Sequence, residues 1–428
     1  MGLIKNFTQL AKTEERGKIL SLVNAALDSI QPQNVIPGIL RLAGDTLGIQ
    51  TQSYELTKYR RLFLIGFGKG SAAFAKEIER IIGGKLAEGF VIDVEGEKLQ
   101  KISFTKGTHP LPSQENYDFT IKLLQHFTEI RLREDDLVLV VVCGGGSAML
   151  VAPDKIDLEK QIAVSKALLA SGANIYDMNT VRKHLSRVKG GGLAKALYPA
   201  TIATMVFSDV PGNDLSFIAS GPTVRDETTI DDAWSLIEKF GIRDTVKLTK
   251  NDLSETPKEE EYFANVHNQV VMSNKTALQA MQKEAAKQGL SARIFSDTFQ
   301  SDANVAGKTL IDEAKKGEVL LAGGETTVKV AGGGEGGRNQ EVVLAALPAL
   351  SEKTILVSFD SDGWDNSHLA GAVGDHLSRA SANSLGLVVD EYLAQNNSLS
   401  FFEQVGDGIE TGRLPANVSD LFIVYKYA

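Results

Sequence analysis

The feature that most constrains the fold is an unbroken apolar run, Leu137–Cys143, that is followed by three glycines. Its residues do not alternate with polar ones, so both faces of the predicted strand must be buried. Such strands are typical of parallel sheets that are covered by helices on both sides. Similar strand-like runs occur at Leu62–Ile65, Phe90–Val94 and Ala200–Val206, with helical spacing between them. The chain is therefore predicted to contain a doubly wound α/β domain.

A chain of 428 residues favours two domains, and the second half predicts a smaller α/β domain. Residues 243–266 are polar and charged, and are interpreted as a surface excursion between the domains. We place the boundary at residue 250, which gives domains 1–250 and 251–428. The other expected elements are a helical region over 12–48 interrupted by Pro37, strands at 269–273, 292–295, 319–322 and 354–358, helices at 275–289 and 302–316, and a hairpin in which 326–331 pairs with 319–322.

Composition excludes several classes of protein. With 45 basic and 54 acidic residues the net charge is −9, so a nucleic-acid-binding surface is not expected, although a local basic pocket is allowed. The single Cys143 excludes a disulfide framework within the chain and a cysteine-based zinc site. We also find no apolar run of about 18 residues and no secretory signal, so a cytoplasmic protein that does not enter membranes is expected.

Two glycine-rich turns that follow predicted strands are candidate anion sites. Gly66–Ser71 carries Lys69, and its glycines let the backbone approach a phosphate at a helix N-terminus. This turn lacks the spacing of a Walker A loop and the complete fingerprint of a dinucleotide site. Gly144–Ser147 offers consecutive amides, and Ser147 is expected to cap the next helix and to donate its hydroxyl. For both turns the alternative is a tight connection without a ligand.

Basic residues are concentrated in Asn179–Gly192, which is unusual in an acidic protein. On a helix, Asn179, Arg182, Lys183 and Ser186 would share one face. Such a face could bind a carboxylate or a phosphate, because ammonium and guanidinium groups pair with both. The alternative is a basic helix face exposed to solvent.

Three further positions carry chemically useful side chains. Asp209 ends a predicted buried strand, a usual place for catalytic or metal-binding carboxylates, although an Asx turn would also explain it. Arg338 follows the glycines at 332–337 at a predicted helix start, where a guanidinium would suit phosphate oxygens. Asp362 lies in the acidic glycine turn 360–366, which suggests contacts to Mg²⁺ or to hydroxyl groups.

The order of six motifs resembles the class II glycerate 2-kinases: GGGSA, NTVRKHLSRVKGG, SDVPGNDLSFIASGPT, GGETTV, GGRNQE and DSDGWDN. The resemblance runs from about Gly66 to Asp420. It implies a larger Rossmann-like, doubly wound N-terminal domain and a smaller C-terminal MOFRL domain. In that family a cleft between the domains binds D-glycerate and ATP. With Mg²⁺, the γ-phosphoryl group is transferred to the C2 hydroxyl, giving 2-phosphoglycerate and ADP. The chain departs from the family in DGWDNSHLAGA, where DGxDGPTDAAGA is usual, and in TGRLPANVSDL, where TGPTGTNVNDL is usual.

The resemblance and the chemistry of the residues together give an expected site. Lys69 and Arg338 match the family's lysine and arginine and are expected to be catalytic, with Asp209 as the base. Asp209 and Asp362 are the expected Mg²⁺ ligands. The expected substrate-binding residues are Ser147, Asn179, Arg182 and Lys183. The expected nucleotide-binding residues are Gly144, Gly145, Gly146, Lys189, Ser220, Gly221, Thr223, Glu325, Thr326 and Asn339.

Two other functions stay open. One is an NAD(P)-dependent hydroxypyruvate reductase, against which the incomplete dinucleotide fingerprint counts. The other is a non-catalytic metabolite-binding protein, which need not keep Lys69, Asp209 and Arg338 together. In each case the expected partners are small molecules, without nucleic acid or membrane, and the chain is expected to be a monomer or a homodimer.

Overall fold

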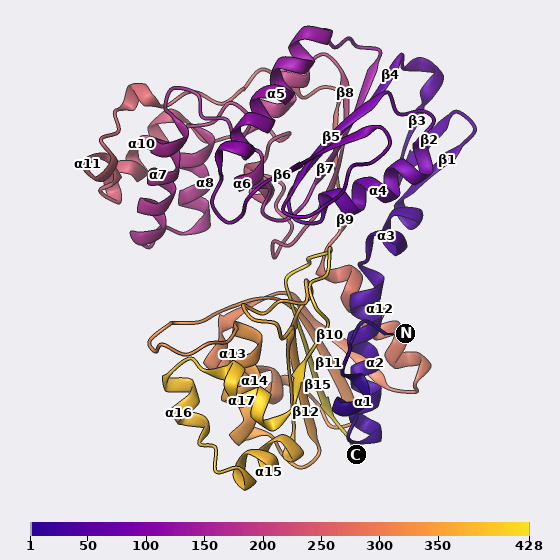
Figure 1. Ribbon diagram of the computed structural model, residues 1–428, viewed down its shortest axis with the longest axis vertical. Helices are drawn as coiled ribbons and strands as arrows, with labels where there is room; N and C mark the ends of the chain where they lie inside the picture. The colour runs from indigo at the N-terminus through magenta and orange to yellow at the C-terminus, as the bar shows by residue number, and fades with distance from the viewer. Residues whose placement is uncertain (1, 428) are drawn as a thin grey trace. The chain divides into compact units, whose positions relative to one another are not determined.

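The computed structural model describes residues 2–427, which divide into two compact units (Figure 1). The parallel-sheet unit consists of Ile36–Ser208 and Asn213–Val271. The mixed-sheet unit contains the residues up to Val35, the short segment Asp209–Gly212 and the chain from Met272 onward. This division differs from the expected boundary at residue 250, because the first helices belong with the second half of the chain. No helix in residues 2–427 is long and apolar enough to cross a membrane.

The parallel-sheet unit has the predicted doubly wound architecture. Its six-stranded sheet has the order β6-β5-β4-β7-β8-β9, and the strands from β6 to β8 pair in parallel. β7 and β8 are buried along their whole length, as their apolar sequences predicted. The strands are β4 (Arg61–Phe67), β5 (Glu88–Asp93), β6 (Ile102–Lys106), β7 (Asp136–Val142), β8 (Thr201–Phe207) and β9 (Val266–Met272).

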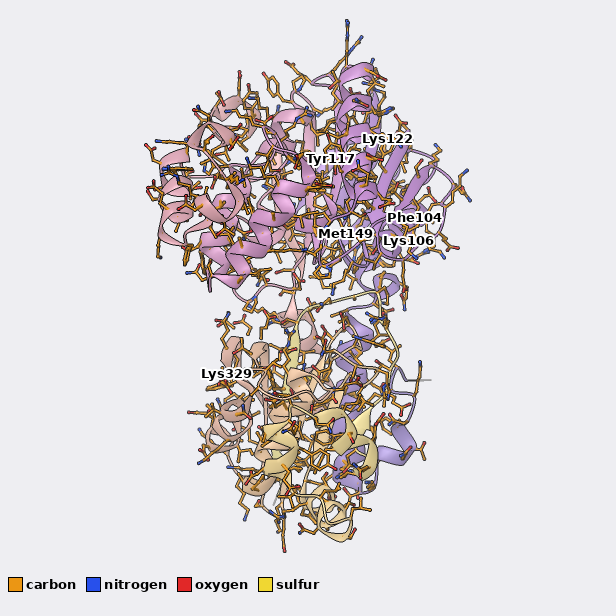
Figure 2. All side chains as sticks on the ribbon, turned by 60° about the vertical axis from the view of Figure 1, so that its left-hand side comes forward. Phe104, Lys106, Tyr117, Lys122, Met149 and Lys329 are labelled. Carbon is orange, nitrogen blue, oxygen red and sulfur yellow. The ribbon has the colours of Figure 1, made fainter. Side chains whose placement is uncertain are left out.

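Helices connect the strands of this sheet. Edge strand β6 was not predicted, since most of its residues are polar. Phe104 and Lys106 mark it in Figure 2, and Tyr117 and Lys122 mark α5, which packs on it. The helices of the unit are α4 (Ser71–Ile82), α5 (Gln114–Ile130), α6 (Gly146–Met149), α7 (Leu158–Ala170), α8 (Ile175–Lys183), α9 (Gly192–Leu197), α10 (Ile230–Lys239) and α11 (Ile242–Val246).

Helices α7, α8, α10 and α11 form a separate layer beside the sheet (Figure 1). Their core includes Leu168, Val181 and Ile237, and also Leu248 and Leu253 from the polar segment that follows α11. The interpretation of residues 243–266 as a surface excursion is therefore wrong for its first half. Two leucines anchor the segment, although its composition is mostly polar.

The helical region expected over residues 12–48 ends earlier than predicted. The structure has α1 (Phe7–Leu10), α2 (Glu14–Ser29) and α3 (Pro32–Ile39), followed by a three-stranded antiparallel sheet of β1 (Leu40–Ala43), β2 (Thr46–Ile49) and β3 (Gln52–Glu55). Gly44 has a φ of +61°, which suits the tight turn between β1 and β2. The leucines at these positions therefore alternate along strands rather than line a helix.

The mixed-sheet unit has a six-stranded sheet of the order β10-β11-β15-β12-β13-β14. β10 and β11 are parallel, and the other pairs are antiparallel. The strands are β10 (Ser291–Asp302), β11 (Glu318–Thr327), β12 (Thr354–Asp360), β13 (Gly371–Gly374), β14 (Gly408–Ile409) and β15 (Asp420–Lys426), and the helices are α12 (Asn274–Lys287), α13 (Ala303–Glu313), α14 (Arg338–Ala346), α15 (His376–Ser384), α16 (Val389–Ala394) and α17 (Ser398–Val405).

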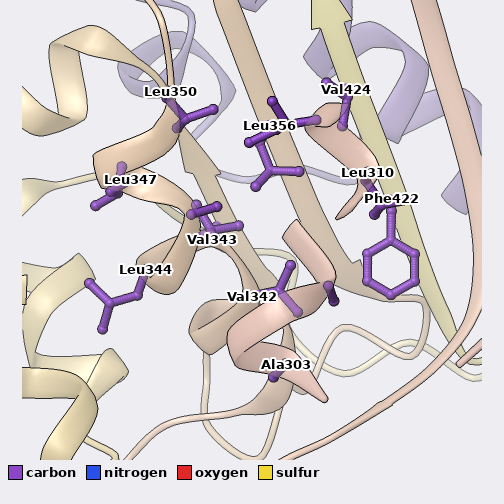
Figure 3. Close-up of a cluster of buried hydrophobic side chains, with 14 of the residues drawn as sticks. Ala303, Leu310, Val342, Val343, Leu344, Leu347, Leu350, Leu356, Phe422 and Val424 are labelled. Atoms are coloured by element: carbon purple, nitrogen blue, oxygen red, sulfur yellow. The ribbon is translucent and has the colours of Figure 1, made fainter. Parts of the chain in front are cut away.

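The core of this unit lies between the sheet and helices α13 and α14. Leu310, Val342, Leu356 and Phe422 meet there (Figure 3). The hairpin expected between 319–322 and 326–331 is wrong, because β11 runs as one strand to Thr327, with β10 and β15 as its two neighbours.

A buried ion cluster explains why the first residues belong to the mixed-sheet unit. The guanidinium of Arg16 on α2 donates to Asp375 at 2.5 and 2.6 Å and to Asp407 at 2.7 Å. Ser378 joins this cluster by donating to Asp407. All four side chains are buried, so removing one would leave charges without partners.

Candidate functional site

The loop between β4 and α4 holds Lys69 next to the glycine turn that follows β7. The backbone N–H of Lys69 donates to the carbonyl of Gly144 at 2.7 Å. Gly68 has a φ of +107°, and a Cβ there would lie 2.4 Å from the carbonyl oxygen of Cys143. Only glycine fits this approach, so the two loops are fixed side by side at the carboxyl ends of neighbouring parallel strands.

The N-terminus of α4, in contrast, is already occupied. The buried carboxylate of Asp93, at the end of β5, accepts hydrogen bonds from the backbone of Ala72 at 3.0 Å and of Val94 at 2.6 Å. Burial raises the pKa of Asp93 to about 6, although bonds from backbone amides, including that of Gly70, act in the opposite direction. Anion binding by this loop would therefore depend on the Lys69 side chain rather than on helix amides.

His109 joins the same place from the loop after β6, and the sequence analysis missed it. A Cβ on Gly145 would lie 2.6 Å from the Cδ2 atom of His109, so the imidazole lies on the glycine turn. Burial, together with the charge of Lys69, lowers the pKa of His109 to about 4. His109 is therefore neutral near pH 7. No local pattern distinguishes this histidine, because only the sheet brings its loop to Gly145.

Four polar side chains, one of them Ser147 of the glycine turn, are linked in a chain of hydrogen bonds. The Nζ atom of Lys189 lies 2.5 Å from the carbonyl oxygen of Ser147, 3.1 Å from its Oγ atom and 3.3 Å from the carbonyl oxygen of Leu150. The hydroxyl groups of Ser147 and Ser220 are 2.8 Å apart, and Ser220 donates to Oδ1 of Asn179 at 2.9 Å. The expectation that Ser147 caps the helix is wrong, since Gly145 is the N-cap residue and makes no side-chain bond.

Arg182 is a half-buried cation without a counterion. Within residues 2–427 its side chain forms no hydrogen bond and no ion pair, and burial alone lowers the pKa of its guanidinium. Asn179 lies one turn earlier on α8, so the two side chains are neighbours. Because α8 ends at Lys183, Ser186 does not share this helical face, and that part of the prediction is wrong.

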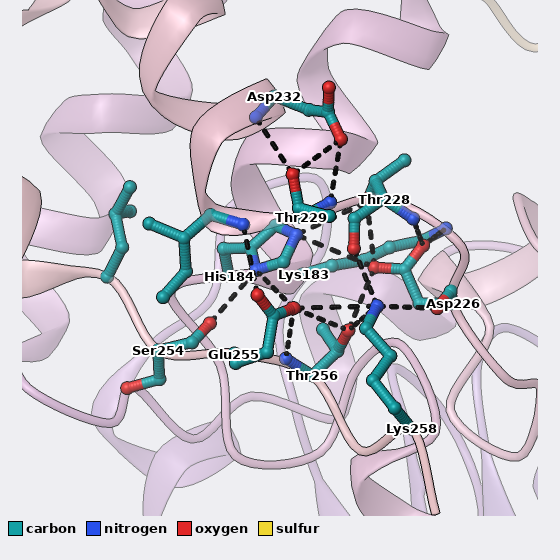
Figure 4. A network of polar contacts seen from close by, with 12 residues as sticks. Lys183, His184, Asp226, Thr228, Thr229, Asp232, Ser254, Glu255, Thr256 and Lys258 are labelled. Carbon is teal, nitrogen blue, oxygen red and sulfur yellow. Dashed lines mark hydrogen bonds and ion pairs between the residues drawn. The ribbon is translucent and has the colours of Figure 1, made fainter.

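Lys183 has a different environment from Arg182. Its Nζ atom lies 3.0 Å from Oδ1 of Asp226, and only 5% of its side chain is exposed. Figure 4 shows this pair within a network of polar contacts, in which His184 also bonds to Ser254 and Thr228. The ammonium group expected at the substrate is therefore committed to an internal ion pair.

The segment that supplies Ser220 is fixed by its own backbone contacts. The carbonyl oxygens of Ser220 and Gly221 accept hydrogen bonds from Gly190 and Gly191 at 2.9 and 2.8 Å. Thr223 donates its hydroxyl to Asn268 at 2.7 Å. Asp209 lies two residues after β8, which ends at Phe207.

A second cluster of predicted residues surrounds Arg338, the first residue of α14. Its Nη1 atom donates to Glu325 at 2.7 Å, its Nε atom donates to Oδ1 of Asp420 at 3.0 Å, and its Nη2 atom lies 3.5 Å from Asp360. About a third of the side chain is exposed, since its relative accessibility is 30%. Arg338 therefore faces three carboxylates of its own unit before any ligand is bound.

Two of these carboxylates, Asp360 and Asp420, have raised pKa values. Burial raises the pKa of Asp360 well above its usual range, and the charges of Asp362 and Asp420 add to the effect. Burial likewise raises the pKa of Asp420 to about 6, against the opposing charge of Arg338. The cluster therefore carries more carboxylates than cations, which favours a further cation or a shared proton.

Two residues expected at the nucleotide are bonded to these acids instead. The backbone N–H of Thr326 donates to Asp420 at 3.1 Å, and the side-chain amide of Asn339 donates to it at 2.7 Å. The N-terminus of α14 is closed by Asp365, which accepts from the backbone of Asn339 and of Gln340 at 3.1 and 2.9 Å. Of the expected nucleotide contacts in this unit, Glu325 is the most accessible, with 45% of its side chain exposed.

Whether a metal ion would fit depends on which side chains could hold it. Over residues 2–427 no group of three or more histidine, cysteine, aspartate or glutamate side chains is arranged to hold one. Carboxylate oxygen is the donor that Mg²⁺ prefers, and Mg²⁺ commonly uses one or two carboxylates together with phosphate oxygens and water. Asp362, whose charge acts on Asp360, fits such a partial site.

A doubly wound α/β unit that carries a lysine in the loop after a strand and an unpaired arginine on a helix is typical of proteins that bind small phosphorylated or carboxylated molecules. The domain family described as a domain of unknown function, DUF4147, matches residues 18–252, and the MOFRL family matches residues 318–420. The chain belongs to this two-domain family, whose curated relatives include glycerate 2-kinases.

The similarity to these relatives extends over nearly the whole chain. A glycerate 2-kinase from Pyrococcus horikoshii is 33% identical, with 94% of this chain and 96% of the relative covered. A D-glycerate 2-kinase from Thermotoga maritima is 34% identical, with 85% and 90% covered. The crystal structure of a glycerate kinase from Thermotoga maritima matches with a TM-score of 0.84 at 31% identity, covering 96% of this chain and 98% of that one. A relative from Agrobacterium vitis, 35% identical over 84% of this chain, is named a putative hydroxypyruvate reductase.

Proposed function

We propose that this protein is a glycerate 2-kinase, which transfers the γ-phosphoryl group of ATP to the C2 hydroxyl of D-glycerate and releases 2-phosphoglycerate and ADP. The observation that carries the proposal is the half-buried guanidinium of Arg182, which has no partner among residues 2–427. A partly desolvated cation without a counterion is unfavourable, and a bound carboxylate would supply the missing charge. Glycerate is a small carboxylate, and its C2 hydroxyl lies on the carbon next to the carboxylate group.

The expected residues take the following roles. Arg182 binds the glycerate carboxylate, and Asn179 and Ser147 contact its hydroxyl groups. Lys183 is left out of this role because Asp226 holds its ammonium group. Asp209 accepts the proton of the attacking C2 hydroxyl. Lys69 and Arg338 neutralise the charge of the phosphoryl group in flight, which is the main task of a protein in phosphoryl transfer.

The nucleotide contacts divide into two groups. The glycines at 144–146 let the backbone approach phosphate oxygens, and Glu325 is an exposed acceptor for hydroxyl groups. Gly221, Thr223, Thr326 and Asn339 support these contacts from behind, since most of their polar groups are bonded within the protein. Lys189 and Ser220, which were also expected at the nucleotide, are bonded to Ser147 and therefore belong with the glycerate contacts. Mg²⁺ would bind mainly to the phosphates of ATP, with Asp209 and Asp362 as its protein ligands, and would neutralise charge during transfer.

A reductase is the alternative that the name of the Agrobacterium vitis relative suggests. Asp93 speaks against it, because its carboxylate fills the N-terminus of α4, where a dinucleotide fold places the pyrophosphate. The deciding experiment measures ADP release with D-glycerate and NADH oxidation with hydroxypyruvate on the same preparation. The proposed glycerate 2-kinase should release ADP only when glycerate is present, and its product should be 2-phosphoglycerate rather than 3-phosphoglycerate. NADH oxidation without ADP release would refute the proposal.

We also infer a cytoplasmic location and a monomeric or homodimeric state. The acidic composition, with its net charge of −9, is compatible with a cytoplasmic protein. Light scattering coupled to size-exclusion chromatography distinguishes 46.1 kDa from twice that mass.

A further inference from the structure

Lys189 is an unusual residue to bury next to a binding site. Its side chain is enclosed by the protein, and its Nζ atom faces two carbonyl oxygens, of Ser147 and Leu150, and the hydroxyl of Ser147. Three acceptors match the three N–H groups of an ammonium ion. The two contacts to carbonyl oxygens are those expected of a purely structural residue. The third contact, to the hydroxyl of Ser147, connects Lys189 to a chain of hydroxyl groups that ends at Asn179.

The charge of Lys189 fixes the direction of this chain. An ammonium group can only donate, so Ser147 accepts from Lys189, and the arrangement that leaves no hydroxyl proton unbonded has Ser147 donating to Ser220. Ser220 must then donate its proton onward, and its remaining partner is Asn179 at 2.9 Å. Asn179 can accept only through Oδ1. The amide of Asn179 is therefore held in one of its two orientations by a lysine that it does not touch.

This orientation has a consequence for the binding site. With Oδ1 turned to Ser220, the Nδ2 group of Asn179 donates no hydrogen bond within residues 2–427, although only 2% of the residue is exposed. Nδ2 is thus a second donor beside the unpaired guanidinium of Arg182 on the same helix. We propose that Lys189 is a positioning residue for glycerate, which acts through Ser147 and Ser220 to present the N–H groups of Asn179 to the substrate. This inference rests on the proposed kinase function.

The protonation of Lys189 gives the proposal a measurable signature. Burial, and then the charge of Arg182 on α8, lower the pKa of Lys189 to about 7. The neighbouring α6 segment presents only carbonyl and hydroxyl groups to it. A neutral amine can accept the proton of Ser147, which lets the chain reverse and releases the amide of Asn179. The kcat/KM for glycerate should therefore fall as the pH rises through about 7.

The test compares two variants that interrupt the chain at different points. Ser220→Ala removes the link to Asn179 and leaves Lys189 in place, whereas Lys189→Met removes the charge and keeps the volume. Each should raise the KM for glycerate about 10-fold, the cost of one hydrogen bond to a charged ligand, with little change in kcat or in the KM for ATP. The pH limb should be absent in both. Ser216→Ala and Lys195→Met are matched controls from the same unit and should behave as the wild type.

The Asn179→Ala variant tests whether the effect on glycerate binding arises at Asn179. Added to Ser220→Ala, it should cause no further loss, because both changes remove the same contact. Independent losses from the two changes, or a pH limb that persists in Ser220→Ala, would overturn the proposal.

A spectroscopic measurement keeps this test separate from the kinase assignment. The side-chain amide signals of Asn179, identified by their loss in Asn179→Ala, should shift across about pH 7 in the protein without ligands and should not shift in Ser220→Ala. Signals that do not change with pH in the wild type would refute the chain itself. If the signals shift but Arg182→Ala and Asn179→Ala leave the KM for glycerate unchanged, the proposed substrate site fails, and with it the role of Lys189 in binding.

Discussion

Arg182 and Arg338 are both half-buried, but their surroundings are opposite. Arg182 lies near Lys189 and has no carboxylate partner among residues 2–427. Arg338 contacts Glu325, Asp360 and Asp420. The cluster around Arg182 therefore lacks negative charge, and the cluster around Arg338 has an excess of it.

This difference indicates which ligand each cluster can accept. A cationic pocket without counterions is complementary to an anion, because the ligand supplies the charge that the protein omits. An arginine already held by carboxylates is fixed in place, and its acidic neighbours favour an approaching cation such as a metal bound to phosphates. The two clusters thus suit the carboxylate of a substrate and the metal–nucleotide complex respectively.

Removal of divalent metal should have the largest effect. Excess EDTA should abolish turnover, since transfer from ATP requires the charge of its phosphates to be neutralised, and added Mg²⁺ should restore it. Glycerate binding without nucleotide, measured by calorimetry, should not respond to EDTA, because the Arg182 cluster uses no metal. Full turnover in EDTA would contradict the assignment of the acidic cluster.

The next largest effects should come from Lys69 and Arg338, the two cations proposed to be catalytic. Lys69→Ala and Arg338→Ala should each lower kcat by about 10²-fold or more, because each removes a charged contact to the transferring phosphoryl group. The matched controls are Lys76→Ala and Arg293→Ala, which remove an ion pair on the same unit in each case, with Glu97 and with Glu318. Near-normal turnover of both catalytic-site variants would refute their roles.

Arg182→Met should separate binding from stability. We expect the KM for glycerate to rise by about 10- to 100-fold, with a smaller change in kcat, because a charged hydrogen bond to the carboxylate is lost. The free energy of unfolding should stay the same or rise, since the variant removes a half-buried charge without a partner.

Arg338→Met should have the opposite effect on stability. It leaves buried Asp360 and Asp420 without their cation, and a loss of about 1–3 kcal/mol is expected, moderated by the partial exposure of the arginine. Trp234 lies in the parallel-sheet unit and Trp364 in the mixed-sheet unit, and they are the two tryptophans of the chain, so single-tryptophan variants report each unit separately. Equal stability changes for the two arginine variants would contradict the contrast between the clusters.

The smallest expected effects are pH slopes of opposite sign. The folded pKa of Lys189 is lowered from 10.5 to about 7, so the unfolded chain binds more protons between these values and the free energy of unfolding rises with pH there. The pKa of Asp420 is raised from 3.8 to about 6, so stability falls as the pH rises through that window. Each slope is at most about 1.4 kcal/mol per pH unit, and the slope of Lys189 should vanish in Lys189→Met. Slopes of the same sign would contradict one of the two assignments.

The sequence predicted the strands that carry the site because their signals are local. Apolar runs such as Leu137–Cys143 identified the buried strands, and the glycines after them identified the loops that the structure brings together. β6 was missed because most of its residues are polar. The small antiparallel sheet after α3 was missed because its leucines fit a helical spacing equally well.

The identity of the basic and glycine-rich residues, and the motifs that place the chain among glycerate 2-kinase relatives, were determined by the sequence alone. Which of these residues remain available was decided by the tertiary structure. Lys183 is paired with an aspartate 43 residues away, whereas the adjacent Arg182 has no partner, and Arg338 meets a carboxylate 82 residues further along the chain. The physical reason is that the residue type alone determines which charge a side chain can carry. Its counterions and its burial, and therefore its pKa, depend on segments that only the folded chain brings into contact.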